Sequence, residues 1–270
     1  MQQLQTPSVL TKIINTKHQE LAQAKKTHSF YDLEQIAHSK KTDLRNFANA
    51  LRTQKRVNII AEVKKASPSK GIICQNFDPV AIAQGYETAG ASCLSVLTDV
   101  QYFQGADDDL VQARQAVSLP VLRKDFMLNP YQIMQSRALG ADAILLIMAC
   151  LSHSQAEELQ ALALELGMTV LVECHNHAEV ERALKLTTHE RTIYGINNRN
   201  LKNFETDLNT TVQLRTLFDS SQLLVTESGI RSANDVKFML QHNINTFLIG
   251  EQFMKTDSPK QALSTLLTSI

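Results

Sequence analysis

Short apolar runs and longer amphipathic stretches alternate along this chain from residue 57 to its end. The runs are rich in β-branched residues and predict strands, whereas the stretches between them have the spacing of helices that bury one face. Because a helix separates each strand from the next, the strands are expected to pair in parallel. The expected strands are 57–63, 92–97, 120–123, 143–149, 169–174, 192–196, 223–226 and 246–249.

Residues that commonly begin or end helices stand at the borders of the amphipathic stretches. Asp78 and Asn129 each precede a proline, the pattern of an N-cap followed by proline in the first helical turn. A helix over 152–166 is expected to end at Gly167, because glycine readily adopts the left-handed conformation that closes many helices. Further N-caps are expected at Asp207, Ser232 and Ser258.

Eight strand–helix units in about 215 residues fit a closed (β/α)8 barrel. An open, doubly wound sheet is the alternative, but such sheets usually bind a nucleotide at a glycine-rich first turn. Neither G-x-G-x-x-G nor G-x-x-x-x-G-K-[ST] occurs in the sequence. The predicted fold class is therefore α/β, a (β/α)8 TIM barrel with an N-terminal helical extension.

The N-terminal extension, residues 1–50, contains no strand–helix unit and instead predicts helices. An apolar stripe at i, i+4 and i+11, interrupted by a lysine at i+7, indicates an amphipathic first helix. No linker rich in glycine or proline follows, so we expect the extension to pack on the barrel and residues 1–270 to form one domain. The stripe is Leu10, Ile14, Lys17 and Leu21, and further helices are expected at 33–37 and 44–51.

The charge of the chain is balanced, with 27 Lys and Arg against 27 Asp and Glu, although residues 1–56 carry 10 basic and only 4 acidic side chains. A neutral chain has no general attraction to nucleic acid or to an anionic membrane, and the basic segment lacks the dense runs of a nucleic-acid-binding arm. No signal peptide is expected, and no apolar stretch approaches the roughly 18 residues of a membrane span. We therefore expect a cytoplasmic protein, a monomer or a weak homo-oligomer, that binds neither nucleic acid nor membrane.

The cysteines show no C-x-x-C spacing and are expected to be reduced and mostly buried. His175 and His177 closely follow one of them, but neighbouring residues at a strand end point to opposite sides, so no metal site is expected there. The eight histidines are expected mostly at the surface, away from the polar strand ends. The cysteines are Cys74, Cys93, Cys150 and Cys174.

Polar and charged residues stand at the ends of several expected strands. The C-terminal ends of barrel strands meet at one mouth, where the active sites of such barrels lie. A closed barrel would therefore bring these side chains into one pocket. They are Glu62 and Lys64 on the first strand, Lys124 after the third, Glu173 on the fifth, Asn197 and Arg199 after the sixth, and Glu227 and Ser228 after the seventh.

Lysines among carboxylates suit acid–base catalysis. A carboxylate keeps a nearby lysine charged while partial burial lowers its pKa, so that the lysine can protonate a carbonyl or hydroxyl oxygen. Lys124 can alternatively form a Schiff base with a carbonyl substrate. Backbone N–H groups at Ser228, Gly229 and Gly250 suit a phosphate ester, which many barrels bind after these last two strands.

Eight short motifs occur along the barrel segment. They are Glu62-Val-Lys-Lys-Ala-Ser-Pro-Ser-Lys-Gly71, Leu97-Thr-Asp with Tyr102-Phe-Gln-Gly105, Arg123-Lys-Asp-Phe126, Ala141-Asp-Ala-Ile-Leu-Leu-Ile147, Val172-Glu173, Gly195-Ile-Asn-Asn-Arg-Asn-Leu201, Thr226-Glu-Ser-Gly-Ile230 and Phe247-Leu-Ile-Gly250. In this order they resemble the motif set of the indole-3-glycerol phosphate synthase family. The basic helical leader resembles that family's extra N-terminal segment.

The resemblance implies a carboxy-lyase of tryptophan biosynthesis that acts on 1-(2-carboxyphenylamino)-1-deoxyribulose 5-phosphate. The ring carbon that bears the carboxylate attacks the C2 ketone, CO2 leaves, and loss of water gives the indole. No metal and no cofactor are implied, and the small sugar phosphate is the implied binding partner.

The resemblance also implies catalytic roles for the matching residues. Lys124 is the expected general acid that protonates the ketone oxygen, and Glu173 is the expected base that removes a proton as the indole forms. Lys64 is expected to pair with the substrate carboxylate and to protonate the departing hydroxyl. The set is completed by Glu62 and Asn197, which would hold sugar hydroxyls, and by Glu227, which would position the lysines.

The remaining matching residues are expected to bind the substrate. Arg199 suits the anthranilate carboxylate, because a guanidinium can donate two parallel hydrogen bonds to a planar carboxylate. Ser67 lies on the first loop, which is expected to be mobile. The phosphate is assigned to Ser228, Gly229 and Gly250, and the aryl pocket to Leu145 with Phe103 and Phe126, two rings that core packing would explain equally well.

Two places depart from the family pattern. Glu251 stands where many relatives carry serine and is left out of the site, because an acid beside a phosphate is unfavourable. Cys174 and His175 follow Glu173 where other residues are more usual, and neither is expected to touch the core of the site. Alternatives are a phosphoribosylanthranilate isomerase, which would need an Asp/Cys pair not seen here, a Schiff-base aldolase, and a sugar-phosphate sensor with a degenerate site.

Overall fold

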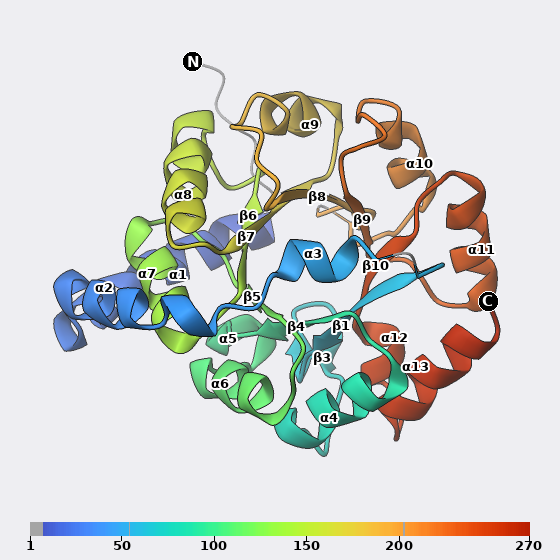
Figure 1. Ribbon diagram of the computed structural model, residues 1–270, viewed down its shortest axis with the longest axis horizontal. Coiled ribbons are helices and arrows are strands. Elements are labelled where there is room, and N and C mark those ends of the chain that lie inside the picture. Colours follow the sequence, from blue (N-terminus) through green and yellow to red (C-terminus); the bar gives the residue numbers. More distant parts are fainter. Residues whose placement is uncertain (1–7, 54, 202) are drawn as a thin grey trace.

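The central feature of the fold is a closed barrel, seen in a computed structural model that describes residues 8–53, 55–201 and 203–270. Its strands within these residues are β1 (Asn58–Val63), β4 (Cys93–Leu97), β5 (Val121–Lys124), β6 (Ala143–Ile147), β7 (Thr169–Cys174), β8 (Thr192–Asn197), β9 (Leu224–Glu227) and β10 (Thr246–Ile249). All pair in parallel, each with the next along the chain and β10 with β1 (Figure 1). The predicted barrel is confirmed, and each of the eight expected strands lies within two residues of its observed bounds.

Helices follow the strands, and most of them cover the outside of the barrel (Figure 1). The expected N-caps at Asp78, Asn129, Ser232 and Ser258 are confirmed, since each side chain accepts a backbone N–H from its helix. These helices are α4 (Pro79–Ala89), α5 (Val100–Phe103), α6 (Asp107–Ala116), α7 (Pro130–Leu139), α8 (His153–Glu165), α9 (His177–Ala183), α10 (Asn209–Arg215), α11 (Ala233–Gln241), α12 (Glu251–Met254) and α13 (Pro259–Thr268).

The expected cap at Asp207 is wrong by one position. The N-cap of α10 is Leu208, whose side chain has no capping group. The Asp207 carboxylate nevertheless accepts the N–H of Asn209 at 2.9 Å. The helix predicted over 152–166 matches α8, with Ser152 as its cap and Gly167 following in the left-handed conformation at φ 81°.

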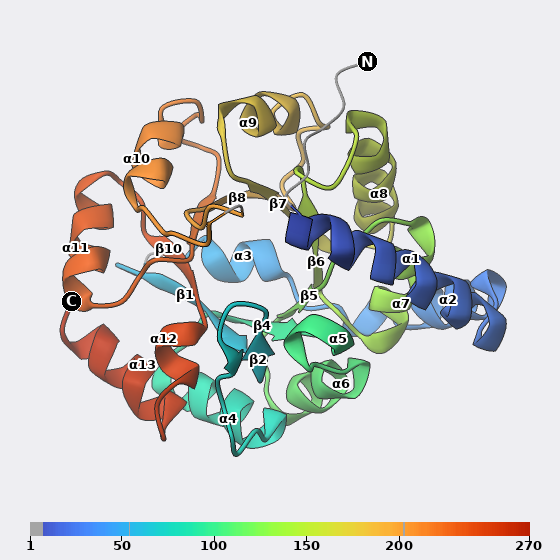
Figure 2. The same cartoon turned by 180° about the vertical axis from the view of Figure 1, so that it is seen from behind.

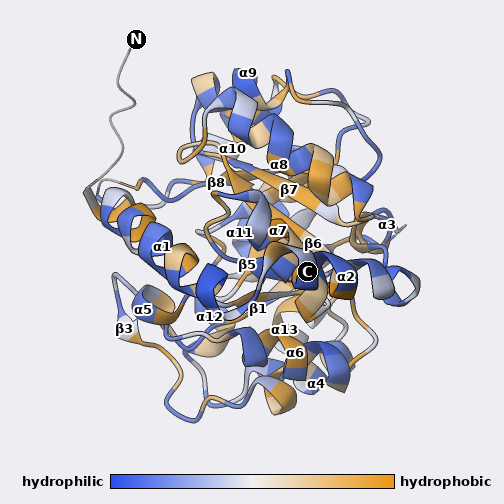
Figure 3. Ribbon diagram, turned by 90° about the vertical axis from the view of Figure 1, so that its left-hand side faces the viewer, coloured by the Kyte–Doolittle hydropathy of each residue, from blue (hydrophilic) through white to orange (hydrophobic). Residues whose placement is uncertain are grey.

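The N-terminal extension lies against both ends of the barrel. It forms α1 (Ser8–Thr27), α2 (Phe30–Ser39), the 3-10 turn η1 (Lys41–Asp43) and α3 (Phe47–Leu51). The side view places α1 at one end of the barrel and α3 at the other (Figure 3), and α1 lies in front of the strands in Figure 2. The third helix begins at Phe47 rather than at residue 44, because Asn46 caps it by accepting the N–H of Asn49.

Helix α3 closes the end of the barrel where the strands begin. Phe47 is fully buried, and its carbonyl accepts the Cys93 thiol at the start of β4. The N–H of Ala48 donates to the hydroxyl of Thr169 at the start of β7. The N-terminal ends of the strands are therefore covered by α3, through packing and hydrogen bonds. The C-terminal ends of the strands, at the opposite end of the barrel, are where a binding site can form.

Strands β1 and β7 are buried along their whole length on both faces, as parallel barrel strands should be. Apolar side chains such as Ile60, Leu122 and Leu171 fill the interior, and two larger clusters lie between the strands and the outer helices. Figure 3 accordingly draws β7 and β8 in the hydrophobic colour. No helix in the described part of the chain has the length and apolar character that a membrane span requires.

Candidate active site

A pocket of about 280 Å3 opens at the C-terminal ends of the strands. It brings together all fourteen side chains and glycines that the sequence assigned to one site, so their expected convergence is confirmed. It also takes in residues that the sequence did not assign, from α1 (Val9, Leu10 and Ile13) and from α12 (Glu251). The fourteen are Glu62, Lys64, Ser67, Phe103, Lys124, Phe126, Leu145, Glu173, Asn197, Arg199, Glu227, Ser228, Gly229 and Gly250.

Lys124, the last residue of β5, lies between two carboxylates. Its Nζ donates to Glu227 Oε2 at 2.6 Å and to Glu173 Oε2 at 3.2 Å. Burial by itself lowers the pKa of Lys124, but the charges of Glu227 and Glu173 outweigh it and raise that pKa above its ordinary value. Both effects that the sequence analysis names act on Lys124, and the effect of the carboxylates prevails over that of burial. The side chain of Lys124 is therefore protonated at neutral pH and can donate a proton.

Glu173 on β7 is buried, and three groups lie around its carboxylate. Besides Lys124, the amide of Asn197 donates to Oε1 at 3.3 Å and His175 Nε2 lies 3.2 Å from the same oxygen. Burial alone would raise the pKa of Glu173, but the charge of Lys124 and the contact with His175 lower it well below its ordinary value. Glu173 is thus held as a carboxylate, the state that a base needs.

His175 is a functional neighbour that the sequence missed. It was expected to lie away from the site, but its ring is only 10% exposed and bridges Glu173 and Glu179, with Nδ1 3.0 Å from Glu179 Oε2. Burial lowers the pKa of His175, and the two carboxylates overcome this and raise it to about 10. The i, i+4 spacing of His175 and Glu179 at the start of α9 was the available signal.

Glu227 on β9 completes the charged group. Burial raises the pKa of Glu227 to about 8, the charge of Glu173 adds to this effect, and Lys124 opposes it. Gly195 leaves space for this side chain, since a Cβ atom there would overlap Glu227 Oε1. Of the two coupled carboxylates, Glu227 therefore holds a proton more readily than Glu173 does.

The raised pKa of Glu227 predicts a pH-dependent contribution to stability. The folded state keeps a proton up to about pH 8 that the unfolded chain loses near the ordinary value of 4.5. This contribution is complete below pH 4.5 and is lost as pH rises through 8, with a slope of at most about 1.36 kcal/mol per pH unit. Glu227→Gln should remove it, so denaturation from about pH 5 to 8 should show a steeper loss of unfolding free energy in the wild type. Equal slopes in both proteins would contradict the assignment.

The end of β1 supplies the second lysine. Lys64 Nζ donates to Glu62 Oε2 at 2.5 Å, which agrees with the prediction that the two side chains share one face. Gly250 gives Glu62 its room, because a Cβ atom at Gly250 would overlap the Glu62 carboxylate. The loop that follows folds into the hairpin β2 (Ala66–Ser67) and β3 (Gly71–Ile72). The buried Oγ of Ser67 has no hydrogen-bond partner among the described residues.

Two consecutive residues after β9 adopt left-handed backbone conformations. Ser228 has φ 62° and Gly229 has φ 90°. The left-handed region is sparsely populated by residues with a side chain, and such strain often accompanies a binding function. With Gly250 at the end of β10, this segment forms one end of the pocket.

Arg199 and Glu251 face each other across the pocket mouth. Arg199 Nη2 lies 3.2 Å from Glu251 Oε2, and both side chains are partly exposed. The expectation that Glu251 stays outside the site is therefore wrong. Its carboxylate forms an ion pair with the Arg199 guanidinium in the pocket lining.

The apolar end of the pocket contains the two predicted rings. The centroids of Phe103 and Phe126 lie 6.3 Å apart with planes tilted by 40°, and both rings are only partly buried. Leu145 on β6 also lines the pocket and is 1% exposed. Both rings thus line the pocket, and Phe126 also packs against the apolar interior of the barrel.

The cysteines of this structure are all free. Cys93 and Cys174 are buried, while Cys74 and Cys150 are partly buried. No cluster of three or more His, Cys, Asp and Glu side chains suited to a metal ion is found among residues 8–53, 55–201 and 203–270.

Comparison with known families shows to which family the chain with this pocket belongs. The model of the family "Indole-3-glycerol phosphate synthase" matches residues 10–266. The chain belongs to this family. It is therefore a carboxy-lyase of tryptophan biosynthesis, as the motifs implied.

Individual relatives agree with the family match. The indole-3-glycerol phosphate synthase of Acinetobacter baumannii strain ATCC 17978 is 53% identical over 259 residues, covering 96% of this chain and 95% of the relative. The Bordetella pertussis enzyme of the same name is 48% identical over 262 residues, covering 96% and 98%. The solved structure of KGPDC from Streptococcus mutans shares the fold with a TM-score of 0.58 at 10% identity, covering 80% of this chain and 97% of that one.

Proposed function

We propose that the enzyme closes the indole ring of 1-(2-carboxyphenylamino)-1-deoxyribulose 5-phosphate in this pocket, with Lys124 as general acid and Glu173 as base. The observation that carries the proposal is the Lys124 ammonium, held 2.6 Å from Glu227 and 3.2 Å from Glu173. It lies between a glycine-rich end suited to phosphate and an apolar end suited to an aryl ring. Such a site can deliver a proton and accept one at neighbouring positions.

In the first step the ring carbon that bears the carboxylate attacks the C2 ketone. Lys124 donates its proton to the ketone oxygen as negative charge develops there, and the ketone becomes a hydroxyl group. The carboxylate then leaves as CO2, and its bonding electrons restore the aromatic ring. Because Glu227 and Glu173 surround the ammonium, it is charged in the resting enzyme and ready for this step.

In the second step the new hydroxyl leaves as water. Lys64 protonates the departing oxygen, and Glu173 removes the proton whose loss forms the indole double bond. Glu62 and Asn197 bind sugar hydroxyls, and the backbone N–H groups at Ser228, Gly229 and Gly250 bind the phosphate.

Arg199 is proposed to bind the carboxylate of the anthranilate ring, and Glu251 releases it when the substrate enters. Arg199→Ala should raise KM roughly tenfold or more and change kcat less, because a hydrogen bond to a charged group is lost mainly from substrate binding. Steady-state kinetics give the two constants separately. Arg52→Ala, an exposed arginine after α3 at the other end of the barrel, should leave both unchanged. An unchanged KM in Arg199→Ala would rule out this role.

The overall proposal is tested by incubating the purified chain with the carboxyphenylamino ketose phosphate and following indole fluorescence together with CO2 release. Both should appear with the same rate. Fluorescence without CO2, or neither signal, would overturn the proposal.

Because α1 lines the pocket, we also propose that the extension and the barrel act as one domain. We propose in addition that the protein is a cytoplasmic monomer or weak homo-oligomer.

A further inference from the structure

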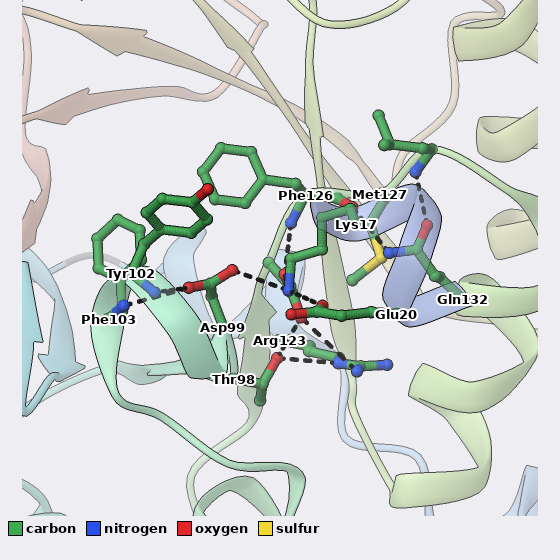
Figure 4. Close-up of polar contacts among 12 residues, drawn as sticks. Lys17, Glu20, Thr98, Asp99, Tyr102, Phe103, Arg123, Phe126, Met127 and Gln132 are labelled. Carbon is green, nitrogen blue, oxygen red and sulfur yellow. Dashed lines mark hydrogen bonds and ion pairs between the residues drawn. The ribbon is translucent and has the colours of Figure 1, made fainter. Parts of the chain in front are cut away.

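Lys17 of α1 is buried directly behind the aryl end of the pocket. The residue is 3% exposed, and its Nζ lies 2.8 Å from Asp99 Oδ2, 3.0 Å from Asp125 Oδ1 and 2.7 Å from Glu20 Oε2. Figure 4 shows Lys17 beside Asp99 and Glu20. Lysine is almost never buried to this extent unless it is paired. It lies in the N-terminal extension, whereas Asp99 and Asp125 follow two barrel strands.

Asp99 connects Lys17 to the first aromatic wall. One carboxylate oxygen, Oδ1, accepts the backbone N–H groups of Tyr102 at 2.7 Å and Phe103 at 3.1 Å, and so caps the short helix α5. The other oxygen, Oδ2, faces Lys17. A second contact joins α1 to the same helix, since the hydroxyls of Thr16 and Tyr102 lie 2.9 Å apart. The position of the Phe103 ring is therefore tied to the lysine.

Asp125 connects Lys17 to the second aromatic wall. It stands in the chain between Lys124 and Phe126, and its Oδ1 accepts the Phe126 N–H at 2.8 Å. Its other oxygen accepts the hydroxyl of Thr98 at 2.8 Å. A shift of Asp125 would therefore move both its neighbours, the Lys124 backbone and the Phe126 ring.

The ammonium is what allows the two carboxylates to lie side by side. Both Asp99 and Asp125 are at most 5% exposed, and two buried negative charges repel each other without a cation between them. Burial would lower the pKa of Lys17, but the charges of Asp125 and Asp99 raise it, so the bridge is charged at neutral pH. Arg123 is a weaker partner of Asp125, at 3.7 Å, and Asp107 shares it.

We propose that Lys17 is a positioning residue of the active site, whose ammonium joins Asp99 to Asp125 and thereby fixes the distance between the Phe103 and Phe126 rings. This inference rests on the proposed function, because it takes the space between the rings as the aryl subsite. The extension then contributes to the site in two ways. It lines the pocket with Val9, Leu10 and Ile13, and through Lys17 it sets the aryl walls.

The test compares Lys17→Met with the matched control Lys12→Met, an exposed lysine about 1.4 turns earlier on α1. Each variant is titrated with two probes, the substrate analogue whose ketone is reduced to an alcohol, and ribulose 5-phosphate, which lacks the aryl group. Lys17→Met should bind the aryl analogue about tenfold or more weakly and lose a similar factor in kcat/KM, because small misplacements near a site are costly. Its affinity for ribulose 5-phosphate should stay within about twofold, as should every constant of Lys12→Met.

The double variant Lys17→Met/Asp99→Asn keeps the test open if the single variant folds poorly. Asparagine retains the oxygen that caps α5 and removes the uncompensated charge, so the double variant should regain thermal stability but not aryl affinity. Normal affinity for the aryl analogue in either folded variant would overturn the positioning role and leave Lys17 as an anchor of α1. The proposed function fails separately, if the wild type makes no indole or if Lys124 proves dispensable.

Discussion

Lys124→Met is expected to lower kcat by about 10²–10⁴, the usual worth of a positioned general acid. Methionine is close to lysine in length and has no proton to donate, so the ketone oxygen would develop its charge without a partner. The loss should fall on kcat more than on KM, because the proton moves only in the transition state. Steady-state kinetics with the carboxyphenylamino ketose phosphate measure both constants.

The substitution also removes the cation between Glu173 and Glu227, so folding has to be checked beside activity. The two buried carboxylates would then repel each other, and the pKa of Glu227 would rise further. Kinetics should therefore be measured well below the unfolding midpoint. Lys237→Met, an exposed lysine on α11, should retain full activity and stability. Activity near wild type in Lys124→Met would refute the acid assignment.

Borohydride separates the acid from the Schiff-base alternative. A Schiff base between Lys124 and the ketone would be reduced to a stable amine and would raise the mass of the enzyme by that of the bound substrate. A general acid forms no such bond. We therefore expect no adduct when wild-type enzyme is treated with substrate and borohydride, and a covalent adduct at Lys124 would favour aldolase chemistry.

The barrel could be predicted because its signals are local. The capping side chains at Asp78, Asn129 and Ser152 act on N–H groups two or three residues away, so the sequence alone contains both partners. The strands were predicted from the apolar runs themselves, and their parallel pairing was predicted from the helices between the runs. The one misplaced cap, Asp207, lies one residue before the observed N-cap, although its carboxylate still accepts the N–H of Asn209 in the first turn.

The site was predictable only in part, because strand ends are local but the partners of each side chain are not. Convergence at one mouth follows from closure of the barrel. The direction in which the pKa of Lys124 shifts could not be predicted in this way. It depends on two carboxylates that lie 49 and 103 residues further along the chain. Lys17 looked like an interruption in an apolar stripe for the same reason. Its partners, Asp99 and Asp125, are supplied by two other elements, and only the fold brings them to the helix.

Glu173→Gln should also be severely impaired, with kcat reduced by about 10²–10⁴ and KM changed little. Glutamine has the same shape and keeps an oxygen for the amide of Asn197, so substrate binding should survive. It cannot accept the proton whose loss completes the indole. An intermediate that has lost CO2 but not water should therefore accumulate. Rapid-quench analysis should detect CO2 release before indole fluorescence, whereas in the wild type the two should coincide.

The pKa of Glu227 gives a second, independent check on the same variant. The negative charge of Glu173 contributes to its elevation, so the neutral glutamine should move the Glu227 pKa down from about 8 and shift the stability profile with it. Glu165→Gln, an exposed glutamate at the end of α8, should alter neither the rate nor the profile. Near-normal turnover in Glu173→Gln would show that another group removes the proton. A normal rate together with a shifted Glu227 pKa would limit the role of Glu173 to its effect on the pKa of Glu227.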